Sequence, residues 1–512
     1  MARRVRLRES AAVMLTFAVL SGCGSAPAPD GTSGSGGVLH IGSVTEMPGL
    51  DPVLLTTPAT GMERGLPVFD SLLRLDASGE VKPQLAESMT SGDAKVWTMK
   101  LRPGVRFTDG TPLDAEAVAY NVERHRAPGS LSPGKALLSS VEEVEVVDDL
   151  TIRFTLAHPS GSFPNVFTAE SSVGFIGSPA AIKADPEGFR DKPVGAGPFM
   201  FKEWVKDDHL TLVKNPQYWQ RGLPHLDGIE FKIIPDGQTR ADALRSDAVQ
   251  LTQADPDNYR PLAADGRFVV HEGSGGQFVF LNQSTEAGRD VRLRRAIQLA
   301  FDPKTANSVI FGANSPWDGD VDCLPWTKES PACLKGDAPA QDIAEAKRLV
   351  AEYVADGGKP RLTLTINDTK VKDAEYIQAT LRQIGIDVTI RGLPAAEMAT
   401  AQAKGDFEFG WSAVSAFASF YPRGYNYFAA KGRNLLKQSN AALDAALDQG
   451  RDALTADERN KGWRKVQSIL NEQAMAVWYS PYPTRMISSS RLRFAEDYRG
   501  GSVYYTENMS LR

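Results

Sequence analysis

The sequence predicts an α/β protein with two or three domains, and three features of the chain support this class. Its length of 512 residues exceeds what a single domain usually holds. Its composition, with 42% hydrophobic and 23% charged residues, is typical of globular proteins. Hairpin patterns dominate the first half, whereas strands alternate with amphipathic helices in the second half, an order typical of α/β folds.

Strand and hairpin signals come first along the chain. Residues 38–43 are expected to form the first strand of the folded part. Residues 96–101 alternate between apolar and polar side chains, which predicts a strand. Asp114 is placed to cap the helix that follows. Residues 141–156 indicate a hairpin because two alternating segments flank an acidic turn.

Helical patterns dominate the second half. Residues 361–366 and 388–391 are expected to be strands, with a helix at 373–384 between them, which gives a β-α-β order. The other expected helices lie at 291–306, 340–355, 440–454 and 458–473.

The first 22 residues have the pattern of a secretory signal peptide. Arginines precede an apolar segment at residues 11–20, and a run of small residues ends at Cys23. The apolar segment is too short for a stable membrane anchor. The placement of Cys23 resembles the bacterial lipobox, which implies a diacylglycerol on its thiol and cleavage before it. An ordinary signal peptide with an incidental cysteine is the alternative.

Residues 23–37 are rich in Gly, Ser, Ala and Pro and are expected to form a flexible tether. No other apolar segment approaches the length of about 20 residues that a membrane-spanning helix needs. We therefore expect a protein held by its N-terminal lipid at the outer face of the cytoplasmic membrane, in the extracytoplasmic or periplasmic space.

The formal net charge of −6 becomes more negative once the arginine-rich leader is removed. An acidic protein of this kind is not expected to bind nucleic acid, or to adhere to anionic lipid by charge alone.

Cys323 and Cys333 are the cysteines outside the lipobox, in a segment that also contains Pro325 and Pro331. In an oxidising compartment they are expected to form a disulfide that closes a surface loop. Two free buried thiols are the alternative.

The same segment carries a set of carboxylates with the spacing of a calcium-binding loop: Asp318, Asp320, Asp322 and Glu329. The position that requires glycine for the sharp turn is Cys323 instead. A solvated acidic loop is therefore favoured, and calcium binding by residues 318–329 is the alternative.

Motifs of the common enzyme classes are absent from the sequence, including the zinc-protease His pair, the phosphate-binding loop, the dinucleotide fingerprint and the nucleophile elbow. Ser132 and Lys135 have the spacing of a serine–lysine acyltransferase motif, but they lie in a turn that contains Pro and Gly. The 6 histidines show no metal-ligand spacing. We therefore expect no catalytic residue, no metal and no cofactor.

Several sequence blocks together resemble a known family. They follow one another over nearly the whole mature chain, at residues 69–73 with 82–88, 97–113, 195–204 with 215–219, and 290–297. These blocks are similar to the extracytoplasmic solute-binding proteins of ABC importers, in family 5, the class that handles oligopeptides, dipeptides and nickel.

The resemblance implies a two-lobed periplasmic-binding-protein type II fold with an extra subdomain inserted in lobe I. After the leader (1–22) and tether (23–37), the expected boundaries are 38–66, 186–288 and 477–512 for lobe I, 67–185 for the inserted subdomain, and 289–476 for lobe II. It also implies a monomer that closes around its ligand by hinge motion and then docks on a membrane permease with its ATPase subunits.

The resemblance further points to residues at the ligand. In the family an early loop, which residues 46–52 with Thr56 and Thr57 resemble here, faces the cleft. In lobe II a segment that contains a tryptophan lines the cleft. The residues expected to contact the ligand are Glu46, Thr56, Thr57, Trp411, Ser412, Val414, Ser415, Tyr421 and Tyr425.

One position departs from the family pattern. Peptide-binding members follow the tryptophan segment with an aspartate that pairs with the amino terminus of the peptide, and this chain has Val414 there. An unpaired buried ammonium would cost several kcal/mol. Either another acid such as Glu46 holds the amine, or the ligand has no free amine at this place.

These observations favour the binding component of a peptide importer. A non-peptide solute, such as an opine, a glycoside or a siderophore-like molecule, is the alternative suggested by Val414. A lipoprotein that acts in sensing or cell-wall assembly on the same fold is a further alternative. Nickel is disfavoured because the expected lobe II contains no histidine.

Overall fold

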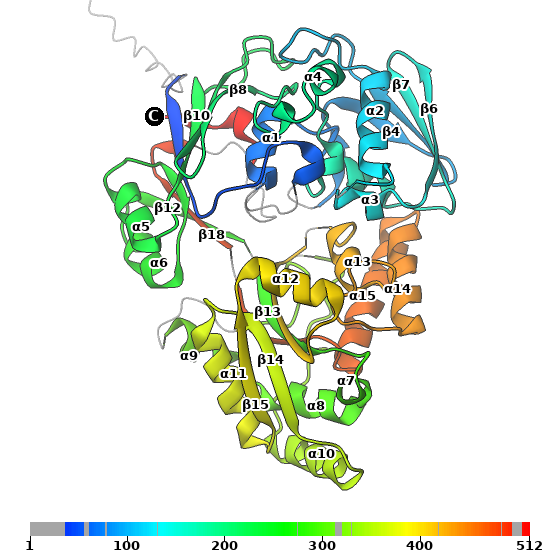
Figure 1. Ribbon diagram of the computed structural model, residues 1–512, viewed down its shortest axis with the longest axis vertical. Coiled ribbons are helices and arrows are strands. Elements are labelled where there is room, and N and C mark those ends of the chain that lie inside the picture. Colours follow the sequence, from blue (N-terminus) through cyan, green and yellow to red (C-terminus); the bar gives the residue numbers. More distant parts are fainter. Residues whose placement is uncertain are drawn as a thin grey trace, which may run out of the picture.

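The computed structural model describes residues 36–55, 61–76, 79–130, 132–273, 275–312, 320–328, 330–417, 419–482, 484–493 and 504–512. The expected leader, most of the tether and Cys23 lie outside these residues, as do Thr56, Thr57, Asp318 and Glu329. The chain forms two bodies of mixed α/β structure (Figure 1).

The upper body in Figure 1 contains lobe I, which we define by its 7-stranded sheet. Its strands, in spatial order, are β12 (Phe268–Gly273), β18 (Thr484–Ser489), β11 (Leu251–Gln253), β1 (Val38–Ser43), β10 (Gly228–Ile233), β9 (His209–Lys214) and β8 (Phe199–Val205). The central strand β1 runs parallel to β10 and β11, and the outer pairs are antiparallel. The helices of lobe I are η1 (Pro52–Leu54), α1 (Glu63–Phe69), η5 (Gly188–Arg190), α5 (Gly237–Arg245), α6 (Pro256–Ala263) and η6 (Thr506–Asn508), and β19 (Leu492–Arg493) pairs with β20 (Ser510–Leu511).

The same body also contains the inserted subdomain, called the insert below, which is built on a 4-stranded antiparallel sheet. Its strands, in spatial order, are β4 (Ala86–Thr90), β5 (Val96–Leu101), β7 (Thr151–Leu156) and β6 (Val141–Asp148), preceded by the ribbon of β2 (Leu73–Leu75) and β3 (Val81–Pro83). Its helices are α2 (Ala115–Arg126), α3 (Gly134–Leu137), η3 (Phe163–Phe167), η4 (Ser172–Gly174) and α4 (Pro179–Ala184). The expected strand, hairpin and Asp114 cap of this part are confirmed, since Asp114 accepts a hydrogen bond from the Ala117 amide at 2.9 Å.

The lower body is lobe II, defined by its 5-stranded sheet. Its strands, in spatial order, are β15 (Asp387–Leu393), β14 (Arg361–Asn367), β16 (Phe409–Ser415), β13 (Gly275–Leu281) and β17 (Val477–Pro481). Its helices are α7 (Glu286–Arg289), α8 (Val291–Ala300), α9 (Pro303–Phe311), α10 (Ile343–Ala355), α11 (Val371–Gln383), α12 (Ala395–Lys404), α13 (Arg423–Phe428), α14 (Ala441–Asp452) and α15 (Ala456–Glu472). One buried cluster joins the sheet to α8–α11, and a second joins its opposite face to α13–α15.

Two expected features of lobe II are wrong. The helix expected over 291–306 ends at Ala300, because Asp302 caps a new helix that has Pro303 in its first turn. The expected boundaries at 288/289 and 476/477 also move, because β13 and β17 pair within the sheet of lobe II. The chain therefore crosses between the lobes from β12 to β13 and from β17 to β18.

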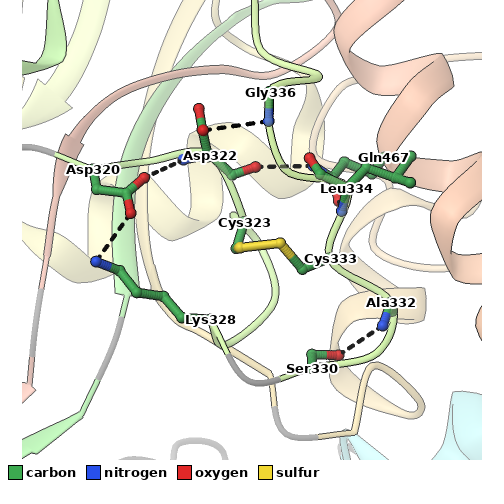
Figure 2. Close-up of a disulfide and its surroundings, with 10 residues drawn as sticks. All are labelled: Asp320, Asp322, Cys323, Lys328, Ser330, Ala332, Cys333, Leu334, Gly336 and Gln467. Atoms are coloured by element: carbon green, nitrogen blue, oxygen red, sulfur yellow. Dashed lines mark hydrogen bonds and ion pairs between the residues drawn. A yellow bond between two sulfur atoms is a disulfide. The ribbon is translucent and has the colours of Figure 1, made fainter.

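The expected disulfide is confirmed: Cys323 and Cys333 are bonded, with Cα atoms 4.9 Å apart (Figure 2). The buried amide of Gln467 on α15 holds the two ends of the same loop, independently of the sulfurs. Its Nε2 donates to the carbonyls of Asp322 and Leu334, both at 2.9 Å, and its Oε1 accepts from the Leu334 amide at 2.9 Å. The disulfide thus closes the loop on itself, and Gln467 holds the closed loop against α15 of lobe II.

Candidate functional site

The two main sheets present the carboxyl ends of their parallel strands toward each other. In lobe I these are the ends of β1, β10 and β11, and in lobe II the ends of β14, β15 and β16. Figure 1 shows both edges on the sides where the two bodies face each other. Ligands of α/β sheets bind outside the carboxyl ends of the strands. We therefore searched for the candidate site between these two edges.

The early loop after β1 carries Glu46, whose carboxylate is bound by the protein itself. Oε2 accepts hydrogen bonds from the Asp207 amide at 2.8 Å and from Trp204 Nε1 at 3.3 Å. Oε1 accepts from the Met47 amide at 2.8 Å and lies 3.5 Å from Arg64 Nη1. Glu46 therefore joins the early loop to the β8–β9 hairpin and to α1, and neither oxygen lacks a protein donor.

A second carboxylate of this loop ties lobe I to the insert. Asp51, which is 4% exposed, lies 2.6 and 3.1 Å from the two terminal nitrogens of Arg124 on α2. This bidentate pair fixes the early loop against the insert.

The first turn of α1 contains the buried neighbours Glu63 and Arg64. Arg64 donates to the Thr45 carbonyl at 2.6 Å and so holds the end of β1. Burial raises the pKa of Glu63 to about 7, and the positive charge of Arg64 only partly opposes this rise. A protonated, neutral carboxyl is therefore the stable form of Glu63 in the folded protein below neutral pH.

In lobe II, Trp411 and Val414 lie on opposite faces of β16, because successive side chains of a strand alternate. Trp411 belongs to the core under α8–α11, where its Nε1 donates to Tyr479 Oη at 2.8 Å. That hydroxyl in turn donates to Asp373 Oδ1 at 2.8 Å. Burial raises the pKa of Asp373, although this hydrogen bond and the charge of Lys370 act against the rise. Trp411 and Val414 were both expected to contact the ligand, but they lie on opposite faces of β16 and in different cores.

Val414 faces the other core and the disulfide loop. It pairs with Gly276 on β13, and a Cβ at Gly276 would lie 2.2 Å from Leu324 Cδ1. Leu324 thus lies directly over this strand pair. The position where an aspartate was expected in peptide-binding relatives is therefore part of a buried apolar cluster, with Ser412 on the same face of the strand and Ser415 on the face of Trp411.

Lys370 is a candidate ligand residue that the sequence reasoning missed. It precedes α11 at the carboxyl end of β14, half-buried, with Nζ 6.0 Å from the ring centroid of Trp411 and 5.0 Å from that of Tyr482. No described residue accepts a hydrogen bond from its ammonium. A lysine placed directly after a predicted strand was the signal that could have identified it.

Tyr421 and Tyr425 lie where lobe II meets the insert. The Tyr425 hydroxyl donates to Asp448 Oδ1 at 2.7 Å and accepts from Arg451 Nη1 at 2.5 Å. The Tyr421 carbonyl accepts from Asn165 Nδ2 of the insert at 3.2 Å. The Tyr425 hydroxyl therefore has its partners within lobe II, whereas Tyr421 is bound by the insert through its backbone carbonyl.

The possible serine–lysine motif does not assemble, and of the acidic loop only Asp320 and Asp322 lie among the described residues. Lys135 Nζ donates to the Pro128 carbonyl at 2.7 Å, while Ser132 Oγ lies 2.5 Å from Nδ1 of His125, so serine and lysine are not paired. His125 is buried, and burial lowers its pKa to about 4. In the acidic loop, Asp320 forms an ion pair with Lys328 at 3.0 Å.

Two searches over the described residues gave negative results. Within those residues no group of three or more His, Cys, Asp and Glu side chains could hold a metal ion. No helix in the described part of the chain is long and apolar enough to cross a membrane.

Glu63 gives a testable pH dependence. Between pH 4.5 and about 7 the unfolded chain ionises Glu63 while the folded protein keeps it protonated, so folding stability should fall with rising pH across this window. Well above pH 7 the loss should be constant, at about 3 kcal/mol. Glu63→Gln should remove this contribution, which urea unfolding at pH 5 and pH 8 can measure. An equal pH dependence in the variant and the wild type would contradict the assignment.

Comparison with known proteins identifies the family. Residues 80–435 match the model of the bacterial extracellular solute-binding proteins, family 5. The glutathione-binding protein GsiB of Salmonella paratyphi A is 30% identical over 423 residues, which cover 78% of this chain and 81% of GsiB. The oligopeptide-binding protein AppA of Bacillus subtilis is 25% identical over 519 residues, 94% of each chain.

Solved structures share the fold. The binding protein AgaA from A. tumefaciens R10, in complex with agropinic acid, has a TM-score of 0.81 at 23% identity and covers 93% of this chain and 99% of its own. The periplasmic binding protein DppA from Helicobacter pylori, in complex with the peptide STSA, has a TM-score of 0.78 at 23% identity and covers 93% and 98%. The chain has the two-lobed periplasmic-binding-protein fold and belongs to the bacterial extracellular solute-binding proteins, family 5.

Proposed function

We propose that this protein captures peptides between its two lobes and delivers them to the permease of an ABC importer, without converting them chemically. The observation that carries the proposal is the half-buried ammonium of Lys370 at the carboxyl edge of lobe II, facing the corresponding edge of lobe I. Peptides carry a carboxylate that this cation can bind. Relatives that bind glutathione and oligopeptides support the same cargo class.

The apolar surroundings of Val414, which include Leu324, limit how the proposed peptide can be oriented. A free ammonium placed there would lose its hydration without gaining an anionic partner. Glu46 does not remedy this, because both of its oxygens have protein donors. The proposed peptide therefore lies with its carboxylate toward Lys370 and does not place its amine at Val414.

A non-peptide solute of the opine type is the second candidate. The absence of an acid at Val414 favours it. Such a molecule can offer a carboxylate to Lys370 without a peptide ammonium. The structure of AgaA holds agropinic acid on the same fold, which shows that the fold can accept this class of ligand.

We also propose that a lipid on Cys23 anchors the protein at the outer face of the cytoplasmic membrane, with residues 23–37 as the tether. A tether of this kind raises the effective concentration of the receptor near its importer. Cys23→Ser should abolish incorporation of labelled palmitate and release the protein from the membrane fraction. Retention of label by the serine variant would contradict the anchor.

The cargo proposal is tested by thermal shift with glutathione, a library of short peptides and agropinic acid. A ligand at 100 times its dissociation constant should add about 2.7 kcal/mol of stability. A shift with a peptide supports the first candidate. A shift with agropinic acid and none with any peptide would overturn it in favour of the second.

The role of Lys370 is tested with the tightest peptide from that screen and its C-terminal amide. The wild type should prefer the free acid by about tenfold, because a partly desolvated charge pair contributes on the order of 1–2 kcal/mol. Lys370→Met should lose this preference, whereas Lys372→Met, which removes an exposed lysine of the same helix, should keep it. Isothermal titration measures both affinities. Equal discrimination by the wild type and Lys370→Met would contradict the assignment.

A further inference from the structure

The C-terminal end of α14 in lobe II receives its hydrogen-bond donors from the insert. The last carbonyls of a helix have no partners within the helix and need donors from elsewhere. Here the amides of Gly161 and Ser162 donate to the carbonyls of Asp452 at 3.3 Å and Arg451 at 3.0 Å. The Ser160 hydroxyl adds a longer contact to the Arg451 carbonyl at 3.4 Å. One body of the molecule therefore caps a helix of the other.

Side chains extend this contact toward α13. Asn165 Nδ2 donates to the Tyr421 carbonyl at 3.2 Å and to the Ser419 hydroxyl. Glu170 of the insert lies 2.7 Å from Arg423 Nε of lobe II, with the two side chains 6% and 17% exposed. A pair this deeply buried is costly to separate, because each charge would lose its partner. The buried residues of the insert and of this face of lobe II form a single cluster.

The insert is held at least as firmly on lobe I. The Arg124–Asp51 pair joins it to the early loop. Asp70, which is 2% exposed and lies at the start of the insert, accepts hydrogen bonds from Gln84, Tyr218 and Trp219 at 2.8–3.1 Å, so it joins the insert to the segment after β9. The insert must therefore stay with lobe I when the lobes move apart, and its contact with lobe II must break.

We infer that residues 160–165 and Glu170 of the insert, together with residues 419–423 and 450–453 of lobe II, form a clasp that stabilises the closed arrangement of the lobes without contacting the solute. Figure 1 shows the insert above α13 and α14 on one side of the molecule, while β12 and β18, which lead to the crossings between the lobes, lie on the other side. The lobes are thus joined at both sides of the solute site. The strength of the clasp sets the fraction of closed molecules, and with it the apparent solute affinity.

Gly161 provides a sharp test. A Cβ at this position would lie 1.9 Å from the carbonyl oxygen of Ala453, so Gly161→Ala should force the clasp apart. Gly129→Ala is the matched control in the insert, since a Cβ there meets nothing within 4 Å. Both variants and the wild type are examined without solute, by small-angle scattering and by hydrogen exchange. This keeps the test independent of the cargo.

Wild type and Gly129→Ala should have the same small radius of gyration, with the Gly161 and Ser162 amides protected from exchange. Gly161→Ala should have a larger radius and about tenfold less protection at residues 160–162. Glu170→Gln, which keeps the side-chain shape and adds no volume, should cause a smaller change in the same direction. Unprotected Gly161 and Ser162 amides in the solute-free wild type would overturn the inference. Scattering of Gly161→Ala and Glu170→Gln identical to that of the wild type would also overturn it.

Discussion

The two-lobed architecture depends on the two places where the chain crosses between the lobes. The strands next to these crossings are hydrogen-bonded to each other in each lobe. On one side of the crossings, β12 and β18 are neighbours in the lobe I sheet. On the other side, β13 and β17 are neighbours in the lobe II sheet. Because hydrogen bonds within each sheet hold these strand pairs, the two connections lie next to each other both at lobe I and at lobe II. The lobes can therefore rotate about one narrow connection while each keeps its own core.

Most of the buried charge near the site supports the scaffold. Glu46, Asp51 and Asp70 each bind several donors from distant segments, and they fix the early loop and the insert on lobe I. Because these carboxylates bind protein donors, they are not available to bind a solute. Lys370 offers a cation at the edge of lobe II, whereas Gly276 and Val414 lie in a buried apolar cluster under Leu324 and offer no charge.

Sequence patterns predicted local structure well and long-range placement less well. The alternation over 96–101 and the Asp114 cap identified β5 and the start of α2, because both signals act within a few residues. The pattern over 291–306 missed the break at Asp302 and Pro303, since periodicity alone continued past a capping residue. The face of Trp411 and the pairing of Tyr425 with Arg451 depend on the sheet register and on a distant helix, which no single segment encodes. Lys370 follows a strand that the sequence predicts, but its place at the edge that faces lobe I depends on the order of the strands in the sheet.

Hydrogen exchange with and without saturating solute tests the central claim, that solute binds between the carboxyl edges of both sheets. The account predicts added protection in two segments at once, residues 43–52 after β1 and residues 367–373 between β14 and α11. Protection confined to one lobe would contradict it. So would protection confined to the surface cavity of lobe II that is lined by Phe301, Lys304 and Gln341.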